Sequence, residues 1–343
     1  MKIYCFFLLL FLISCGKDSK PHEYITIGGL FPLTGEFCNE GIRALNGLQL
    51  ARQVINESGG ILGKRLDIIV LDDKNDIQHA MEQYDILKKK GVIAIVGSSF
   101  PEVTQALMKA AEKDNMPIIS PTAVYPEKPK VLASFAYNTL KAKTALTIDN
   151  HKYDSIVNVF EEEFKRNGGK ILSREYYSSP KDFEAILKKY KSNQPDIIFC
   201  PTNYIAAAKL TEAAHKLGLD KPNFIGTHAW EGILGFLQEY EIMDRIYYAS
   251  SFMANNEDPD VREFSQNFFM SYNHVPSSTS ALSYSSVQTL VAAIKSSGST
   301  ESNDIIAAMK ANTPNVIAKQ DPQTVYIMRI KKEFYSLFEK IDL

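Results

Sequence analysis

The stretch VIAIVGSSFPEVTQALMKAAEKD, residues 92–114, contains the structural unit that recurs along this chain. Its first five residues are apolar and predict a buried strand, whereas residues 103–114 predict a helix. Several units of this kind in one chain are typical of an α/β protein with parallel sheets. The loop between the two, residues 97–102, then lies at the carboxyl end of a strand, where such proteins bind small ligands.

This loop admits two interpretations, and the sequence leaves both open. Ser99 and Glu102 have the spacing of a capping box, and Pro101 is tolerated in the first turn of a helix. In that interpretation, which we place first for Ser99, Glu102 partly cancels the positive end of the helix dipole and weakens an anion site. In the other interpretation, Ser99 and the backbone near Phe100 contact a ligand.

The composition limits the classes of function. The chain has 343 residues, of which 45% are apolar and 23% charged, so it is long enough for two globular domains. Its formal net charge is −2, and we therefore expect no nucleic-acid partner. No P-loop, zinc motif or serine-nucleophile elbow is present, and we expect no cofactor and no metal.

The first fifteen residues, MKIYCFFLLLFLISC, differ from the rest. Their apolar core of about a dozen residues is too short to span a bilayer and is typical of a signal peptide. The residues from Leu12 to Cys15 resemble a bacterial lipobox, which implies cleavage before Cys15 and a diacylglyceryl group on its sulfur. We therefore predict a signal peptide at 1–14 and a lipidated tether at 15–23; an ordinary secretory signal with an incidental cysteine is the alternative.

Two cysteines, Cys38 and Cys200, remain after removal of the signal and lipidation of Cys15. An exported chain permits a disulfide, but two cysteines this far apart in sequence are weak evidence for one. We interpret them as free thiols.

Strand-like and helix-like segments alternate in two successive series, which predicts two lobes of similar build. In the first series the predicted strands are 24–31, 65–71, 92–96 and 117–120, and the helices are 41–56, 77–90 and 103–114. In the second series the strands are 145–148, 171–177, 196–200 and 223–226, and the helices are 155–166, 183–191 and 205–217. Helices at 261–272, 283–297 and 303–311 and a strand pair at 325–330 and 333–338 follow.

Several motifs, in order, resemble one family. They are PLTG, ESGGILGKRL, LDDKND, IISPTA, NFIGTHAWEG and SALSYSSVQTLVAAI. The chain is thereby similar to type I periplasmic binding proteins, and among them to the branched-chain amino-acid (Leu/Ile/Val) receptors of ABC transporters. The resemblance implies a two-lobed Venus-flytrap fold, each lobe a mostly parallel sheet flanked by helices. It also implies that the chain binds a small amino-acid-like solute without catalysis and delivers it to ABC permease subunits.

The resemblance also implies where the lobes begin and end. We expect lobe 1 to comprise 24–130 plus about 252–320, and lobe 2 to comprise about 131–251 plus 321–343. Relative to the family, the chain lacks about a dozen residues between Lys130 and Val131, including a segment that crosses the hinge. A second segment is shorter near 316–320.

The ligand contacts implied by the resemblance lie in both lobes. They are Ser99, Phe100, Thr122 and Val124 in lobe 1, and Tyr153, Asn203 and His228 in lobe 2. Three contact positions depart from the family: Pro101 and Val124 replace hydroxyl residues, and His228 replaces an acid. A neutral imidazole accepts one hydrogen bond, but it does not supply the missing negative charge. We therefore expect something other than ordinary tight leucine binding.

Other readings of these residues stay open. Tyr153 also fits a first-turn helix residue that packs on its own lobe, and His228 also fits a surface loop. We interpret Trp230 as a packing anchor and Glu40 as a solvent-exposed acid in a first helical turn, with a place in the cleft as the second alternative for each. We interpret the aspartates at 72, 73 and 76 as a polar loop, because their spacing does not match a calcium loop.

Two further functions deserve comparison with solute transport. Cys200 and His228 lie on neighbouring strand-end loops, which would suit a thiol–imidazole enzyme, but no motif surrounds either residue. A ligand sensor of the same fold that signals to a membrane receptor, or a degenerate receptor that no longer binds, is the alternative to an importer component. In each case we expect an exported chain, anchored through its lipid to the cell envelope.

Overall fold

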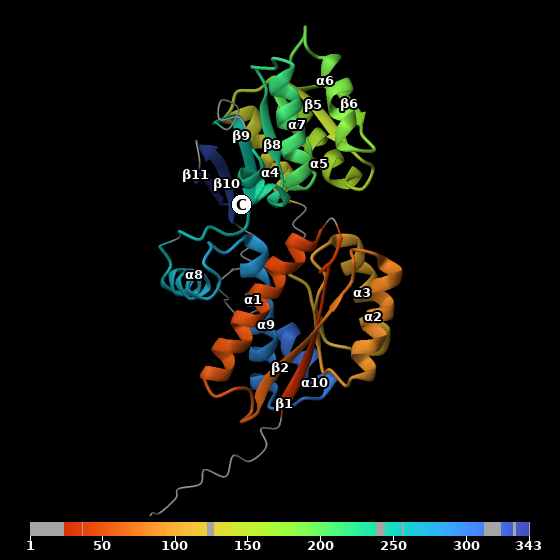
Figure 1. Cartoon of the computed structure of the whole chain (residues 1–343), viewed down its shortest axis with the longest axis vertical. Helices are drawn as coiled ribbons and strands as arrows, with labels where there is room; N and C mark the ends of the chain where they lie inside the picture. The colour runs from red at the N-terminus through yellow and green to blue at the C-terminus, as the bar shows by residue number, and fades with distance from the viewer. Residues whose placement is uncertain are drawn as a thin grey trace, which may run out of the picture.

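The computed structural model describes residues 24–35, 37–121, 127–237, 244–255, 257–311, 324–331 and 334–342. They form two lobes, one above the other, each built on its own β-sheet (Figure 1). Of the predicted positions, Cys15, Thr122, Val124 and the segment 316–320 lie outside the described residues. None of the helices within the described ranges combines the length and the apolar character needed to cross a bilayer.

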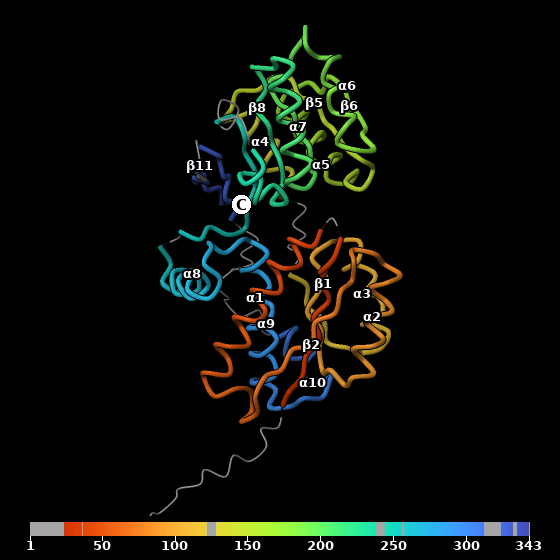
Figure 2. Tube along the Cα trace, viewed as in Figure 1, coloured from red at the N-terminus to blue at the C-terminus, as the bar shows by residue number. Residues whose placement is uncertain are grey.

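Lobe 1 is built on a four-stranded parallel sheet with the order β2-β1-β3-β4. Its strands are β1 (Tyr24–Phe31), β2 (Arg65–Asp72), β3 (Ile95–Gly97) and β4 (Ile118–Ile119). Its helices are α1 (Cys38–Glu57), α2 (Ile77–Lys89), α3 (Pro101–Asp114), α8 (Pro259–Tyr272), α9 (Ser278–Ser297) and α10 (Ser302–Ala311). The helices α8 to α10 return to this lobe after the chain has passed through lobe 2, as the trace in Figure 2 shows.

The alternation of side chains along β1 explains the layers of lobe 1. Ile25, Ile27 and Phe31 point to one face, where they pack with residues of α1 and α9. Leu30 points to the other face and packs with residues of α2 and α3. Helices therefore cover both faces of the sheet, as Figure 1 shows. This arrangement is the one expected for parallel strands joined by helical crossovers.

Lobe 2 is built on a seven-stranded sheet with the order β11-β10-β9-β8-β7-β5-β6. Its strands are β5 (Thr144–Asp149), β6 (Lys170–Tyr176), β7 (Ile197–Phe199), β8 (Asn223–Gly226), β9 (Ile246–Ser250), β10 (Thr324–Lys331) and β11 (Phe334–Asp342). Its helices are α4 (Glu127–Asn138), α5 (Asp154–Arg166), α6 (Phe183–Lys188) and α7 (Tyr204–Lys216), with 3₁₀ turns η1 (Pro180–Asp182), η2 (His228–Trp230) and η3 (Ile233–Phe236). Strands β5 to β9 are parallel, whereas β10 runs antiparallel to both β9 and β11.

Helix α4 contains the predicted boundary between the two lobes. Lys130 and Val131 are consecutive residues inside α4, whose apolar side chains from Val131 onward belong to the core of lobe 2. The helix runs without a break through the point where the resemblance implies missing residues. The lobe boundaries themselves stay a prediction.

Helices α1 and α9 of lobe 1 pack in close contact. A Cβ atom on Gly47 of α1 would lie 2.1 Å from the backbone oxygen of Ser280, so only glycine allows this approach. The start of α9 therefore lies directly against the middle of α1, and Thr279 also reaches Glu40 in the first turn of α1.

Candidate functional site

The loop after β3 is held rigidly by its own hydrogen bonds. Ser98 is buried, and its hydroxyl donates to the buried carboxylate of Asp73 over 2.6 Å. The backbone carbonyl of Ser98 accepts from the hydroxyls of Thr104 and Ser120, at 3.1 and 2.9 Å. Burial raises the pKa of Asp73, although the hydrogen bond from Ser98 opposes that shift. The loop is thus a fixed platform at the carboxyl edge of the sheet.

The predicted capping box at Ser99 is wrong. The residue that precedes the first turn of α3 is Phe100, in extended conformation with φ −124° and ψ 137°, and Pro101 occupies the first helical position. Ser99 therefore lies one residue too early to cap, and α3 has no side-chain cap. The Ser99 hydroxyl is buried and has no hydrogen-bond partner among the described residues. An unpaired buried hydroxyl is costly, and a ligand would satisfy it.

The aromatic ring of Phe100 lies beside that hydroxyl along the chain. It contacts Phe37, which immediately precedes α1, edge to face with ring centroids 4.8 Å apart. Both rings are partly exposed, so lobe 1 presents an apolar surface next to the Ser99 loop.

The three predicted contacts of lobe 2 lie along one edge of its sheet. Tyr153 follows β5, Asn203 follows β7 and His228 follows β8, and these three strands are parallel neighbours. The structure therefore brings the three residues to one edge. Their local roles differ: Tyr153 directly precedes α5, whereas Asn203 caps α7 by accepting from the amide of Ala206 over 2.9 Å.

His228 is the first residue of η2 and is partly exposed. Burial lowers the pKa of His228 to about 3, and the positive charge of Lys128 adds to the shift. The imidazole is neutral at physiological pH, so it offers a hydrogen bond without a charge.

Sequence reasoning missed a group of charged side chains close to His228. Lys128, near the start of α4, is buried, and burial lowers its pKa to about 8 against the attraction of Glu231. Burial raises the pKa of Glu231 to about 7, although Arg43 attracts its negative charge. Glu231 belongs to the motif NFIGTHAWEG and lies three residues after His228. An acidic side chain is therefore still present near the position where His228 replaces the acid of the family.

The prediction that Glu40 is a solvent-exposed acid is also wrong. Only 18% of its side chain is exposed; its carboxylate accepts from the hydroxyl of Thr279 and lies 3.7 Å from the guanidinium of Arg43. The reason is the close approach of α9 to α1 described above, which covers the first turn of α1. Spacing along one helix does not reveal such a cover.

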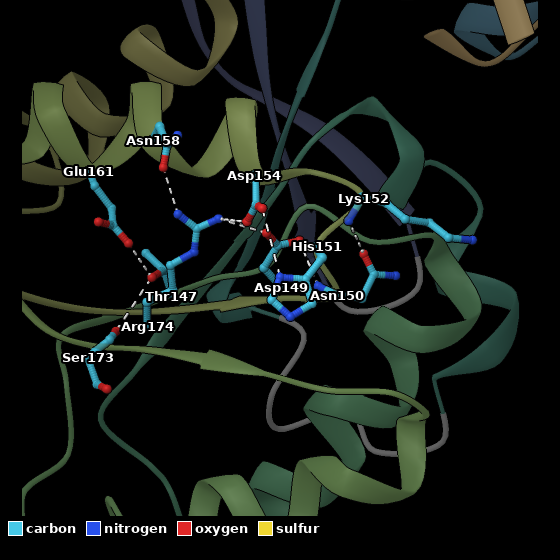
Figure 3. Close-up of polar contacts among 10 residues, drawn as sticks. All are labelled: Thr147, Asp149, Asn150, His151, Lys152, Asp154, Asn158, Glu161, Ser173 and Arg174. Carbon is cyan, nitrogen blue, oxygen red and sulfur yellow. Dashed lines mark hydrogen bonds and ion pairs between the residues drawn. The ribbon is translucent and has the colours of Figure 1, made fainter. Parts of the chain in front are cut away.

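An ion-pair network around the buried Asp149 joins β5, β6 and α5 (Figure 3). Arg174 of β6 donates to the buried carboxylate of Asp149 at the end of β5 over 2.8 Å. The same guanidinium contacts Asp154 and donates to Asn158 of α5 over 2.7 Å. Burial raises the pKa of Asp149 in spite of Arg174. Arg174 thereby joins β6 to both ends of the loop that contains Tyr153, at Asp149 and at Asp154.

The strand-end aspartates of lobe 1 are structural, as expected for a polar loop. Asp72 accepts from the amide of Leu33 over 2.7 Å and from the hydroxyl of Thr34. Asp76 caps α2 by accepting from the amide of His79. Within the described ranges, no group of three or more histidine, cysteine or acidic side chains is arranged to hold a metal ion.

Trp230 is a packing anchor, as predicted. Its side chain is fully buried, and its indole N–H donates to the carbonyl of Cys200 over 3.1 Å. The Cys200 thiol is also fully buried, and burial raises its pKa well above the usual range. A thiol in this state is a poor nucleophile, so the structure does not support the thiol–imidazole enzyme. Cys38 and Cys200 are both free, as expected.

We expect iodoacetamide at pH 8 to alkylate Cys38 but not Cys200 in the folded protein, because the thiolate is the nucleophile and the Cys200 thiol is inaccessible and protonated. Peptide mass spectrometry after a time course measures both sites, and the same reaction in denaturant, where both should react, is the control. Alkylation of Cys200 in the folded protein as fast as in denaturant would contradict this assignment.

Two α/β lobes, with polar and aromatic side chains at the strand ends where they meet, define the class of two-lobed solute-binding proteins. The chain belongs to the periplasmic binding protein family, whose model matches residues 24–322. This membership confirms the predicted fold class and the expectation of a non-enzymatic solute-binding protein.

Individual binding proteins are similar to this chain in sequence and in structure. The leucine-, isoleucine-, valine-, threonine- and alanine-binding protein of Pseudomonas aeruginosa is 24% identical over 333 residues, which cover 90% of this chain and 87% of the relative. The Leu/Ile/Val-binding protein homolog 3 of Brucella melitensis is 22% identical over 61% of this chain and 62% of its own length. The branched-chain amino acid transporter substrate binding protein LivJ of Streptococcus pneumoniae, solved with isoleucine, has a TM-score of 0.85 at 25% identity, covering 94% of this chain and 100% of that one.

Proposed function

We propose that the chain is an extracytoplasmic solute-binding lipoprotein of an ABC importer. It binds a small amino-acid-like solute between its lobes and presents it to permease subunits. The relatives with branched-chain amino acids in their names support this solute class. The observation that carries the proposal is the Ser99 hydroxyl, which is buried without a hydrogen-bond partner among the described residues, whereas the hydroxyl and carbonyl of the adjacent Ser98 are both hydrogen-bonded.

The residues at the carboxyl ends of the strands in the two lobes suit a small solute with a carboxylate and a short apolar part. Ser99 donates to the carboxylate, and Phe100 supports the apolar part. In lobe 2, Tyr153 covers the solute, Asn203 lies beside it, and His228 accepts one hydrogen bond from it. Backbone groups at Thr122 and Val124 remain predicted contacts of the same solute.

The anchor follows from the first residues of the chain. Cys15 carries the lipid, and the nine residues from 15 to 23 span at most about 30 Å between the membrane and β1. This tether keeps the binding protein in the cell envelope, close to the permease.

A thermal-shift screen of residues 16–343 against amino acids, short amides, sugars and purines tests the proposal. A solute present at about a hundredfold excess over Kd adds about 2.7 kcal/mol to the free energy of unfolding, which raises Tm visibly. Amino acids or close relatives are the expected hits. A folded protein that responds to no compound would contradict the proposal and favour the sensor or the degenerate receptor.

For a solute that binds, Ser99→Ala is expected to weaken affinity by about tenfold, because the variant loses one hydrogen bond to a charged group. Titration calorimetry measures the change. Ser283→Ala is the matched control: its hydroxyl is also buried without a partner within the described residues, but it lies inside the α9 core. Equal affinities of Ser99→Ala and the wild-type protein would remove Ser99 from the site.

A further inference from the structure

One arginine of lobe 1 reaches across to lobe 2. Arg43, in the first two turns of α1, donates from Nη1 to the backbone carbonyl of Glu231 over 2.9 Å. Its guanidinium carbon lies 5.2 Å from the centre of the Tyr204 ring, at the start of α7. A charge-assisted hydrogen bond and a cation–π contact thus join the two lobes at one side chain.

A second contact joins a side chain of lobe 2 to the backbone of lobe 1. The carboxylate of Glu231 in lobe 2 accepts from the backbone amide of Ser278 over 2.9 Å. Ser278 is the first residue of α9 in lobe 1, so the acid lies at the positive end of a long helix. We refer to Arg43, Tyr204, Glu231 and Ser278 as the cross-lobe cluster.

The surroundings of Arg43 fit it for this position. Gly232 has a φ of +102°, and a Cβ atom there would lie 2.3 Å from Nη2 of Arg43, so glycine makes room for the guanidinium. On the other side, Arg43 lies 3.7 Å from the carboxylate of Glu40, which the hydroxyl of Thr279 also binds. The guanidinium is therefore positioned by its own lobe before it meets lobe 2.

We propose that the cross-lobe cluster holds the two lobes together in the ligand-free protein, with Arg43 and Glu231 as its positioning residues. The equilibrium between open and closed molecules is then set partly by contacts of the chain itself. A ligand that binds the closed form adds to a population that already exists. The inference concerns the ligand-free protein, so it stands independently of the solute class proposed above.

Single-molecule FRET on ligand-free residues 16–343 tests this proposal. Dyes are attached at Met108→Cys on α3 and Lys188→Cys on α6, both exposed, in a Cys38→Ser background. The wild-type cluster is expected to give a dominant high-efficiency population. Arg43→Ala is expected to lower the ratio of closed to open molecules by about tenfold, because one charge-assisted hydrogen bond and one cation–π contact are lost.

The matched control is Arg52→Ala on the same helix. Arg52 lies 3.6 Å from Asp67 of its own lobe, so its loss should leave the FRET distribution unchanged. An Arg43→Ala protein with a wild-type distribution and wild-type circular dichroism would overturn the proposal.

A second pair of variants keeps the test independent of the folding of Arg43→Ala. Ser278→Pro removes the amide that Glu231 binds, and proline is well tolerated at the first position of a helix. The preceding Ser277 is extended, with ψ 168°, as a residue before proline requires. Ser278→Ala keeps the amide but loses the hydroxyl, which bonds the hydroxyl of Ser250 in β9 and also interacts with Glu231. Both variants lose this hydroxyl, so the difference between them isolates the amide. Greater opening in Ser278→Pro than in Ser278→Ala supports the cluster, whereas identical distributions in the two contradict it.

Discussion

Replacement of Trp230 by alanine is expected to lower the free energy of unfolding by about 3–5 kcal/mol, the range for large aromatic side chains deleted from a core. The indole is fully buried beside β8, and a Cβ atom on Gly226 would lie 2.1 Å from it, so the ring fills its space closely. The strands and the helix α7 that pack against η2 are regular elements, which limits how far they can collapse into the cavity. Because Trp230 is the only tryptophan, urea unfolding must be followed by far-UV circular dichroism.

Trp230→Phe is the companion variant. It keeps most of the apolar volume and removes the indole donor, but the carbonyl of Cys200 still accepts from the amide of Thr202 over 2.9 Å. We expect a loss of about 1–2 kcal/mol, since no buried group is left without a partner. A loss below 1 kcal/mol for Trp230→Ala would show that the ring does not anchor this edge of lobe 2.

Arg174→Met is expected to lower the free energy of unfolding by about 3–5 kcal/mol, because it leaves the buried carboxylate of Asp149 without its cation. That carboxylate has no exposed surface, and the guanidinium also ties it to Asp154 and Asn158. Loss of the network also frees the loop before α5, so affinity for any solute that contacts Tyr153 should fall. Urea unfolding and calorimetry on the same preparation measure the two effects.

Arg166→Met provides the control for charge and size. Arg166 pairs with Glu163 over 2.6 Å in the same lobe, but 67% of its side chain is exposed, so its loss should cost less than about 1 kcal/mol. Equal losses for the two variants would mean that Arg174 acts as an ordinary surface charge.

The pH dependence of the stability of Arg174→Met shows whether its loss of stability comes from the unpaired Asp149 carboxylate or from a packing defect. The folded-state pKa of Asp149 is already raised by burial, and removal of Arg174 takes away an interaction that lowers it. An acid whose folded pKa exceeds its unfolded value favours folding at low pH, and this stability is lost as the pH rises through the folded pKa. The deficit of the variant should therefore grow from pH 4 to pH 7, and Asp149→Asn in the same background should abolish that growth.

Local patterns predicted the fold because they act over short distances. The apolar run before Gly97 and the alternation along β1 specify strands, and their repetition with helices specifies parallel sheets. The order of motifs then predicted the family, which the match over residues 24–322 confirms. The placement of Tyr153, Asn203 and His228 along one sheet edge follows from the same logic, since parallel strands end on the same side.

The errors at Ser99 and Glu40 have a common origin. A capping box requires a particular backbone at the cap, and here Pro101 with an extended Phe100 moves the helix start one residue past Ser99. Whether a first-turn acid is exposed depends on what covers it, and Glu40 is covered by α9, more than 230 residues away in sequence. Spacing within one segment contains neither piece of information.

The sequence by itself determined most of the strands and helices, the class of fold and the buried tryptophan, because periodicity and apolar content act on neighbouring residues. Helix α4 (Glu127–Asn138) and strand β9 (Ile246–Ser250) were not predicted. Only the tertiary structure decided that the Ser99 hydroxyl has no partner among the described residues, that Arg174 joins β6 to α5, and that Arg43 meets Glu231 between the lobes. Each of these depends on where two distant backbones pass each other. Desolvation and ion pairing change steeply over a few ångströms, and such distances are set by packing rather than by spacing along the chain.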